Sequence, residues 1–186
     1  FLTKMDTSLL DKAIHFAVDA HQGAERRGKG FPYILHPLEA VAIVSTMTSD
    51  QTLLAAAVLH DVVEDTPVTL AQLRDIFGAE VADLVATESH KPGEGWRESR
   101  ERTMAALRTA TRTYKIVALG DKLSNMRAIA RDYRELGNQL WQRFNAPNGA
   151  DDYAWYYRSL VATLYELHDT EAHQEFARLV QEIFPD

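Results

Sequence analysis

The segment LLAAAVLHDVVEDT at residues 53–66 begins with seven apolar residues and continues with a histidine and three carboxylates. A helix that is apolar on every face is buried, so the run predicts a helix surrounded by protein. Residues four apart stack on a helix, which places His60 beside Glu64. Asp61 and Asp65 form the neighbouring row. Burying unpaired carboxylates costs several kcal/mol, which a bound cation would remove. The alternative is a helix end in water, with a solvated acidic turn and a core histidine.

The composition predicts one folded domain over residues 1–186. A chain of this length builds one good hydrophobic core, and 46% hydrophobic with 25% charged residues is ordinary for a globular protein. The absence of cysteine excludes disulfides, thiolate zinc sites and a catalytic cysteine. Any metal must therefore be held by imidazole and carboxylate groups.

Charge and hydropathy restrict the partners. A net charge of −7 and a pI near 5.5 argue against nucleic acid, because affinity for it comes mainly from Lys and Arg. The longest apolar run is too short for a bilayer span, and the N-terminus lacks the apolar core of a signal peptide. We therefore expect a cytoplasmic protein without a membrane partner. The oligomeric state, and whether Phe1 is the true start, stay open.

Helical periodicity and capping signals recur along the chain, and no strand, repeat or linker is evident. The sequence predicts an all-α fold, a helical bundle of about eight to ten helices. In the first half of the chain, helices are expected to start at Ser8, at Pro37 (to about 47), at Ser49 or Asp50 (to Thr66) and at Thr69, where Thr69 and Gln72 form a capping box and Gly78 ends the helix. A short helix to about 87 should follow. The remaining helices are expected over 96–110, 113–131, 139–144, around 153–164, and over 171–183. Residues 90–95 are expected to form a turn-rich loop.

Two regions outside the acidic segment also carry polar groups of interest. The loop at 23–32, GAERRGKGFP, is a candidate anion-binding loop. His36 precedes Pro37, so it should be extended or capping at the mouth of a helix. In the first helix, one stripe should contain His21, which we expect to pack rather than catalyse, together with Leu10, Ile14, Ala17 and Val18.

The expected helix at 113–131 carries an apolar stripe and a polar row beside it. Asp121 and Asn125 lie in that row with Val117, so Asp121 should face inward or lie at the edge of a site. A simpler possibility is that Asp121 pairs with Lys122 or Arg127. The stripe consists of Ile116, Leu119, Leu123 and Met126.

Read in order, RRGKGFPYILHP, VLHDVVEDT and ALGDKLSNMR resemble the signature of the HD-domain metal phosphohydrolases. More narrowly, they are similar to the RelA/SpoT-type hydrolase domain and to its stand-alone form, the small alarmone hydrolases. The resemblance covers about residues 10–164 and implies a single HD-type helical domain.

The resemblance implies one metal ion, usually manganese (Mn²⁺), bound by His36, His60, Asp61 and Asp121. Two imidazoles and two carboxylates suit a first-row transition ion and leave coordination positions for water and a substrate oxygen. Taken singly, each ligand has a simpler explanation. His36, for example, could cap a helix.

The resemblance also implies residues for catalysis and for substrate. Glu64 and Asp65 match the acidic pair that orients and deprotonates the attacking water, with Glu64 favoured, although one of the two could be a solvated turn residue. Arg26 and Arg27, with Lys29 as a third candidate, match a basic loop that contacts the nucleotide and its phosphates. A solvated basic loop is the competing interpretation.

Tyr33 and Asn125 match positions that line the nucleotide pocket, Tyr33 against base or ribose, although both could be structural. The chain departs from the family at Ala24, where many relatives carry Gln. It also departs at Glu98-Ser99-Arg100, which stands where the family has a Glu-Arg-Lys run.

The implied activity is hydrolysis of the 3′-pyrophosphate of ppGpp or pppGpp, alarmones of the stringent response, to GDP or GTP plus pyrophosphate. The chain has no synthetase segment, so a stand-alone hydrolase is expected. The alternatives are an HD-domain phosphohydrolase for another nucleotide, such as the 2′-phosphate of NADPH or a nucleoside monophosphate, and a nucleotide-binding module without turnover. A helical interaction protein whose polar cluster is incidental is a third possibility.

Overall fold

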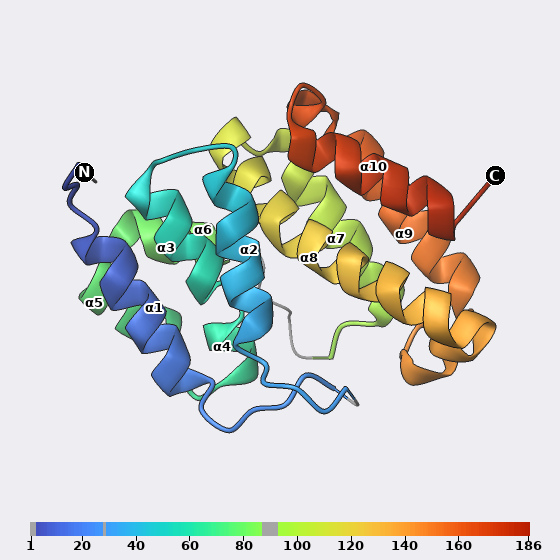
Figure 1. Cartoon of the computed structure of the whole chain (residues 1–186), viewed down its shortest axis with the longest axis horizontal. Helices are drawn as coiled ribbons and strands as arrows, with labels where there is room; N and C mark the ends of the chain where they lie inside the picture. The colour runs from blue at the N-terminus through green and yellow to red at the C-terminus, as the bar shows by residue number, and fades with distance from the viewer. Residues whose placement is uncertain (1–2, 28, 87–92) are drawn as a thin grey trace. The chain divides into compact units, whose positions relative to one another are not determined.

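The computed structural model describes residues 3–27, 29–86 and 93–186, and its regular elements in these ranges are all helical (Figure 1). The helices are α1 Ser8–Ala20, α2 Leu35–Ser45, α3 Gln51–Leu59, α4 Val62–Asp65, α5 Leu70–Phe77, α6 Ala79–Ala86, α7 Trp96–Thr109, α8 Arg112–Leu136, η1 Gly137–Arg143, α9 Ala150–Thr163, η2 Tyr165–Leu167 and α10 Glu171–Ile183. An isolated backbone bridge joins Glu25 and Pro32, and no strand occurs among the described residues. The all-α prediction is confirmed. None of the described helices has the length and hydropathy needed to cross a membrane.

The helices group into two compact units, with α1 to α6 in the first and α7 to α10 in the second. Each unit is described below by itself. The prediction of one domain over residues 1–186 stays a prediction. Of the turn-rich loop expected at 90–95, residues 90–92 lie outside the described residues.

In the first unit, α3 is the central helix and packs against α1, α2 and α6. Its residues 53–59 are all buried, as the apolar run predicts. Asp50 caps α3, since its side chain accepts a hydrogen bond of 2.9 Å from the backbone N–H of Thr52. The capping box of Thr69 and Gln72 at the start of α5 is also present.

The expectation of one uninterrupted helix through residues 53–66 is wrong. α3 ends at Leu59 and α4 begins at Val62, so His60 and Asp61 lie at the junction between them. The ring Nδ1 of His60 donates a 2.6 Å hydrogen bond to the carbonyl of Ala57. The N–H of residue 61 would need that carbonyl in a continuous helix, so the imidazole competes with the helical ladder. The chain then ends α4 at Thr66, as predicted.

Two details of the first unit differ from the sequence expectations. α2 begins at Leu35, so His36 and Pro37 both lie in its first turn, where N–H groups need no helical partner and proline is tolerated. The buried face of α1 consists of Ala13 and Ala17, whereas Val18 is 45% exposed. His21, just after α1, is buried as expected.

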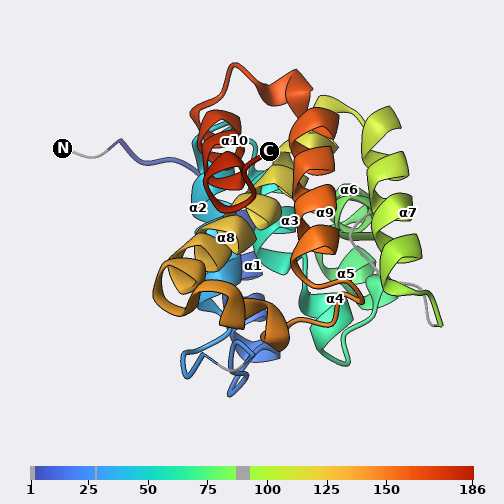
Figure 2. The ribbon, with the colours of Figure 1, turned by 90° about the vertical axis from the view of Figure 1, so that its right-hand side faces the viewer.

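In the second unit, α8 packs against α10, and the two run side by side in Figure 1, while Figure 2 shows α7 beside α9. The predicted stripe of α8 is buried: Ile116, Leu119, Leu123 and Met126. α8 continues five residues past the predicted end at 131 and stops at Gly137, whose φ of 57° only glycine adopts easily. The bounds of α10 match those predicted for the last helix.

Candidate metal centre

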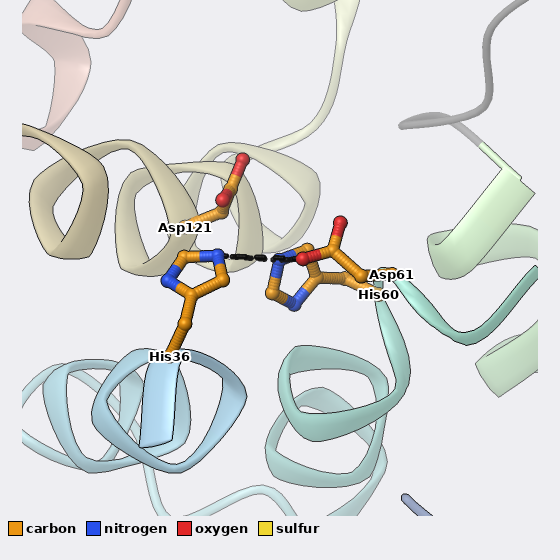
Figure 3. A group of neighbouring side chains, drawn as sticks. All are labelled: His36, His60, Asp61 and Asp121. Carbon is orange, nitrogen blue, oxygen red and sulfur yellow. Dashed lines mark hydrogen bonds and ion pairs between the residues drawn. The ribbon is translucent and has the colours of Figure 1, made fainter. Parts of the chain in front are cut away.

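Three of the expected ligands meet within the first unit. His36 comes from the first turn of α2, and His60 and Asp61 come from the junction after α3. Figure 3 shows the two imidazole rings and the Asp61 carboxylate pointing toward one another. The two Nε2 atoms are 3.3 Å apart, and Asp61 Oδ2 lies 3.3 Å from the Nε2 of His36 and 2.8 Å from that of His60. Both histidines are buried.

The hydrogen bond to Ala57 determines which nitrogen of His60 can act as a ligand. A carbonyl only accepts, so Nδ1 of His60 carries a proton and Nε2 is the nitrogen that faces Asp61. A positive charge between Nε2 and the carboxylate oxygen, 2.8 Å away, stabilises this contact, and either a proton on Nε2 or a bound cation supplies it. The arrangement is therefore compatible with a cation site.

The spacing of the three atoms fits a divalent metal. Ligand atoms about 2.1 Å from one ion and at right angles to each other lie about 3.0 Å apart. The observed separations of 2.8 to 3.3 Å surround that value. Metal-binding histidines usually donate their second N–H to a carbonyl or carboxylate, as His60 does. The two imidazoles and the carboxylate, together with the hydrogen bond that holds His60, fit a transition-metal ion.

Tyr33 lies directly against this cluster. Its hydroxyl donates a 2.6 Å hydrogen bond to Oδ2 of Asp61, the same oxygen that faces the two histidines. Burial, and then the negative charges of Asp61 and Asp65, raise the pKa of the Tyr33 phenol well above its usual range. The phenol is therefore neutral and acts as a hydrogen-bond donor.

Only one of the two basic loop residues approaches Tyr33. The backbone N–H of Arg26 donates to the carbonyl of Phe31, which closes the loop, and its guanidinium lies 6.0 Å from the centre of the Tyr33 ring. Arg27 is exposed on the same loop. The structure thus links Arg26, Tyr33 and Asp61 into one continuous set of contacts.

The two expected catalytic carboxylates lie on α4. Asp65 is exposed and lies close enough to Tyr33 to help raise the pKa of its phenol, so it belongs to the same group of side chains as Asp61. Glu64 is exposed on the same turn. The backbone N–H of Asp65 donates a 2.9 Å hydrogen bond to the carbonyl of Asp61, so the i, i+4 relation expected for this pair is present across the first turn of α4.

Asp121 and Asn125 belong to the second unit. Asp121 is 6% exposed on α8, in agreement with the prediction that it faces inward. Its Oδ2 accepts a 2.6 Å hydrogen bond from Lys122, and its Oδ1 accepts one of 2.8 Å from Asn125. The simpler pairing with Lys122 is thus present, whereas Arg127 pairs with Glu175.

His21 is a buried neighbour of Tyr33 that the motifs do not single out as functional. The centres of the two rings are 4.9 Å apart, and neither ring nitrogen of His21 has a hydrogen-bond partner among the described residues. Burial lowers the pKa of His21, opposed in part by the charges of Asp61 and Asp65. The sequence motifs also do not identify the carbonyl of Ala57, which accepts the hydrogen bond from His60, because a backbone group leaves no signal in a motif.

Comparisons with known sequences identify the family. A family profile described as HD domain matches residues 13–150. The bifunctional (p)ppGpp synthase/hydrolase SpoT of Escherichia coli K12 is 34% identical over 135 residues, which are 69% of this chain and 19% of that protein. A guanosine-3′,5′-bis(diphosphate) 3′-pyrophosphohydrolase of Haemophilus influenzae is 38% identical over 119 residues, 61% of this chain and 17% of that protein. The chain thus spans about a fifth of the length of the curated relatives it matches.

Two solved structures share the fold. The crystal structure of lmo0812 from Listeria monocytogenes EGD-e has a TM-score of 0.74 at 31% identity and covers 81% of this chain and 99% of that one. The structure of a metazoan ortholog of SpoT, described as hydrolysing ppGpp, has a TM-score of 0.80 at 21% identity and covers 97% of this chain and 98% of that one. At that identity the second likeness shows the fold alone. The profile match and the Listeria structure together establish that this chain belongs to the HD domain family.

Proposed function

We propose that this chain is a metal-dependent phosphohydrolase that removes the 3′-pyrophosphate of ppGpp or pppGpp and releases GDP or GTP. The observation that carries the proposal is the convergence of two imidazole nitrogens and one carboxylate oxygen within a segment matched by the HD domain profile. The choice of substrate is supported by the names of the relatives from E. coli and H. influenzae.

The proposed metal is one Mn²⁺ ion held by His36, His60, Asp61 and Asp121. Asp121 is included because it is a buried carboxylate in the DKLSN segment, inside the region that the family profile matches. Two imidazoles and two carboxylates suit manganese and related ions. When bound, the metal would lower the pKa of water and offset charge on a phosphate oxygen.

The protein's own groups would then handle the proton and the substrate. The oxygen of water forms a bond to phosphorus and the bond from phosphorus to the 3′ oxygen breaks. A carboxylate of Asp65 or Glu64 accepts the proton of water, and the departing 3′ oxygen takes up a proton to become the 3′-hydroxyl of the product. Arg26 and Arg27 offset charge on the phosphates, because guanidinium groups match phosphate oxygens in pairs. Tyr33 and Asn125 are proposed to border the nucleotide.

Two further features belong to the same proposal. Residues 1–186 form one HD-type domain, and the enzyme works in the cytoplasm as part of the stringent response. The first is supported by a family profile that spans residues 13–150, most of the chain. Its acidic charge supports the view that nucleotides, rather than nucleic acids, are its partners.

Turnover of a nucleotide panel tests the proposal. Metal-depleted protein is incubated with ppGpp, pppGpp, NADPH and nucleoside monophosphates, with and without Mn²⁺, and the released pyrophosphate and phosphate are measured. We expect Mn²⁺-dependent release of pyrophosphate from ppGpp and its loss in Asp61→Asn. Asp83→Asn is the matched control, because Asp83 pairs with Arg74 on the surface of the first unit.

The outcomes separate the parts of the proposal. Turnover of another nucleotide but not ppGpp would overturn the substrate and leave the metal-dependent mechanism in place. Equal activity of Asp61→Asn and the parent protein would overturn the metal site. Binding of ppGpp without any turnover would favour a nucleotide-binding module.

A further inference from the structure

Tyr33 is placed to act on the metal ligand rather than on the nucleotide alone. Its hydroxyl donates to Oδ2 of Asp61 at 2.6 Å, and Oδ2 is the Asp61 oxygen that lies 2.8 and 3.3 Å from the two imidazole nitrogens. A carboxylate oxygen has two lone pairs, so Oδ2 can accept from Tyr33 and still bind a cation.

The position of the Tyr33 ring is itself determined by its neighbours in the first unit. The His21 ring lies 4.9 Å away, centre to centre, and the His36 ring 6.0 Å away in an edge-to-face arrangement. The backbone N–H of Tyr33 donates to the carbonyl of Ala24, and its own carbonyl accepts from the N–H of His36. These contacts leave the hydroxyl little freedom to move away from Asp61.

Asp61 needs such support because it lies outside regular helix. It occupies the junction between α3 and α4, where its side chain makes no capping hydrogen bond. The hydrogen bond from Tyr33 therefore contributes to the orientation of this carboxylate. Hydrogen-bond partners of metal ligands typically change metal affinity 10- to 100-fold when they are removed.

We infer that Tyr33 is a positioning residue for the metal, which orients the Asp61 carboxylate through the hydrogen bond to Oδ2. This inference rests on the metal site in the proposed function. It goes beyond the pocket-lining role expected from the sequence, because it assigns the hydroxyl to a ligand of the protein and not to the substrate.

The substitution Tyr33→Phe tests the inference, because it removes the hydroxyl and keeps the ring with its contacts to His21, His36 and Arg26. The matched control is Tyr156→Phe. Tyr156 is 4% exposed in the second unit, and its hydroxyl has no hydrogen-bond partner among the described residues. Both variants lose one phenolic oxygen, but only the first loses a hydrogen bond to a proposed ligand.

The measurement is the affinity of metal-depleted protein for Mn²⁺ by isothermal titration calorimetry, in the absence of any nucleotide. We expect Tyr33→Phe to weaken binding about 10- to 100-fold. Tyr156→Phe should stay within about twofold of the parent protein, because it removes no support from a ligand. Circular dichroism of the metal-free proteins checks that both variants fold. If Tyr33→Phe does not fold, Tyr33→Leu is used in its place, because leucine also lacks the hydroxyl but has a smaller side chain.

An unchanged Mn²⁺ affinity in folded Tyr33→Phe or Tyr33→Leu would overturn the inference alone. Failure of the parent protein to bind Mn²⁺ would overturn the metal site and the inference together. Because no nucleotide is present, a wrong assignment of the substrate would not alter either result. Equal weakening in Tyr156→Phe would show that loss of any buried hydroxyl is sufficient, and would also count against the inference.

Discussion

At the scale of single residues, one side chain both interrupts a helix and prepares a ligand. His60 donates from Nδ1 to the carbonyl of Ala57, which leaves Nε2 directed at Asp61 and His36. The same hydrogen bond takes up a carbonyl that the helix would otherwise use. The HD dipeptide is therefore a local break in the helix as well as a pair of donors.

His21 provides a test at this scale. Burial lowers the pKa of His21, so the folded protein resists protonation of this ring more than the unfolded chain does. The nearby rings of His36 and His60 lower the pKa further, whereas the charges of Asp61 and Asp65 oppose the shift in part. Its contribution to stability is complete above the ordinary value of 6.5 and is lost as the pH falls from 6.5 toward the lowered pKa.

We therefore expect metal-free protein to lose more unfolding free energy between pH 7.5 and 5.5 than His21→Phe does, by up to about 1 kcal/mol. At pH 7.5 the two should be similar, because the ring nitrogens of His21 have no hydrogen-bond partner to lose among the described residues. Urea denaturation at both pH values measures this. Identical pH dependence in the two proteins would contradict it.

At the scale of elements, helix ends and ion pairs set the register of each unit. Arg127 pairs with Glu175, and seven residues further along both helices Arg134 pairs with Glu182. Since both numbers increase together, α8 and α10 run parallel, with a repeat of two helical turns. In the first unit, the cap at Asp50 fixes where the buried helix α3 begins.

The cap predicts a stability effect of known size. Asp50→Ala should lower the free energy of unfolding by about 1 kcal/mol, because the N–H of Thr52 loses its acceptor at the start of α3. Asp50→Asn keeps a side-chain oxygen at the same place and should stay close to the parent protein. Urea denaturation of the three proteins measures the free energy of unfolding. An equal decrease in Asp50→Ala and Asp50→Asn would rule out the hydrogen bond as the cause.

At the scale of the whole molecule, the metal should contribute to stability. A ligand that binds only the folded state stabilises it by about 2.7 kcal/mol at a hundredfold excess over its dissociation constant. Differential scanning calorimetry should show a higher melting temperature with Mn²⁺, reversal by a chelator, and little shift in Asp61→Ala. If residues 1–186 act as one domain, the metal-bound protein should melt in a single transition. Two separate transitions would contradict the single domain, and a Mn²⁺ shift in Asp61→Ala equal to that of the parent would contradict the metal site.

Much of the secondary structure could be read from local patterns. The capping box at Thr69 depends on neighbours a few residues away and is where the sequence places it, whereas α8 runs past its predicted end at 131 and stops at Gly137. The errors arise where a side chain competes with the backbone, as at His60, or where proline is accepted within a first turn, as in α2. Local propensity does not weigh such competition.

The sequence by itself determined the helical class and the buried character of α3, because these follow from residue type and spacing, and its resemblance to the HD-domain family supplied the set of residues proposed to bind a metal. Only the tertiary structure decided that His36 meets His60 and Asp61, that Tyr33 donates to Oδ2 of Asp61, and that Asp65 is close to Tyr33. The reason is physical. A motif states which groups are available, but contacts between side chains 24 to 28 positions apart form only after the helices pack.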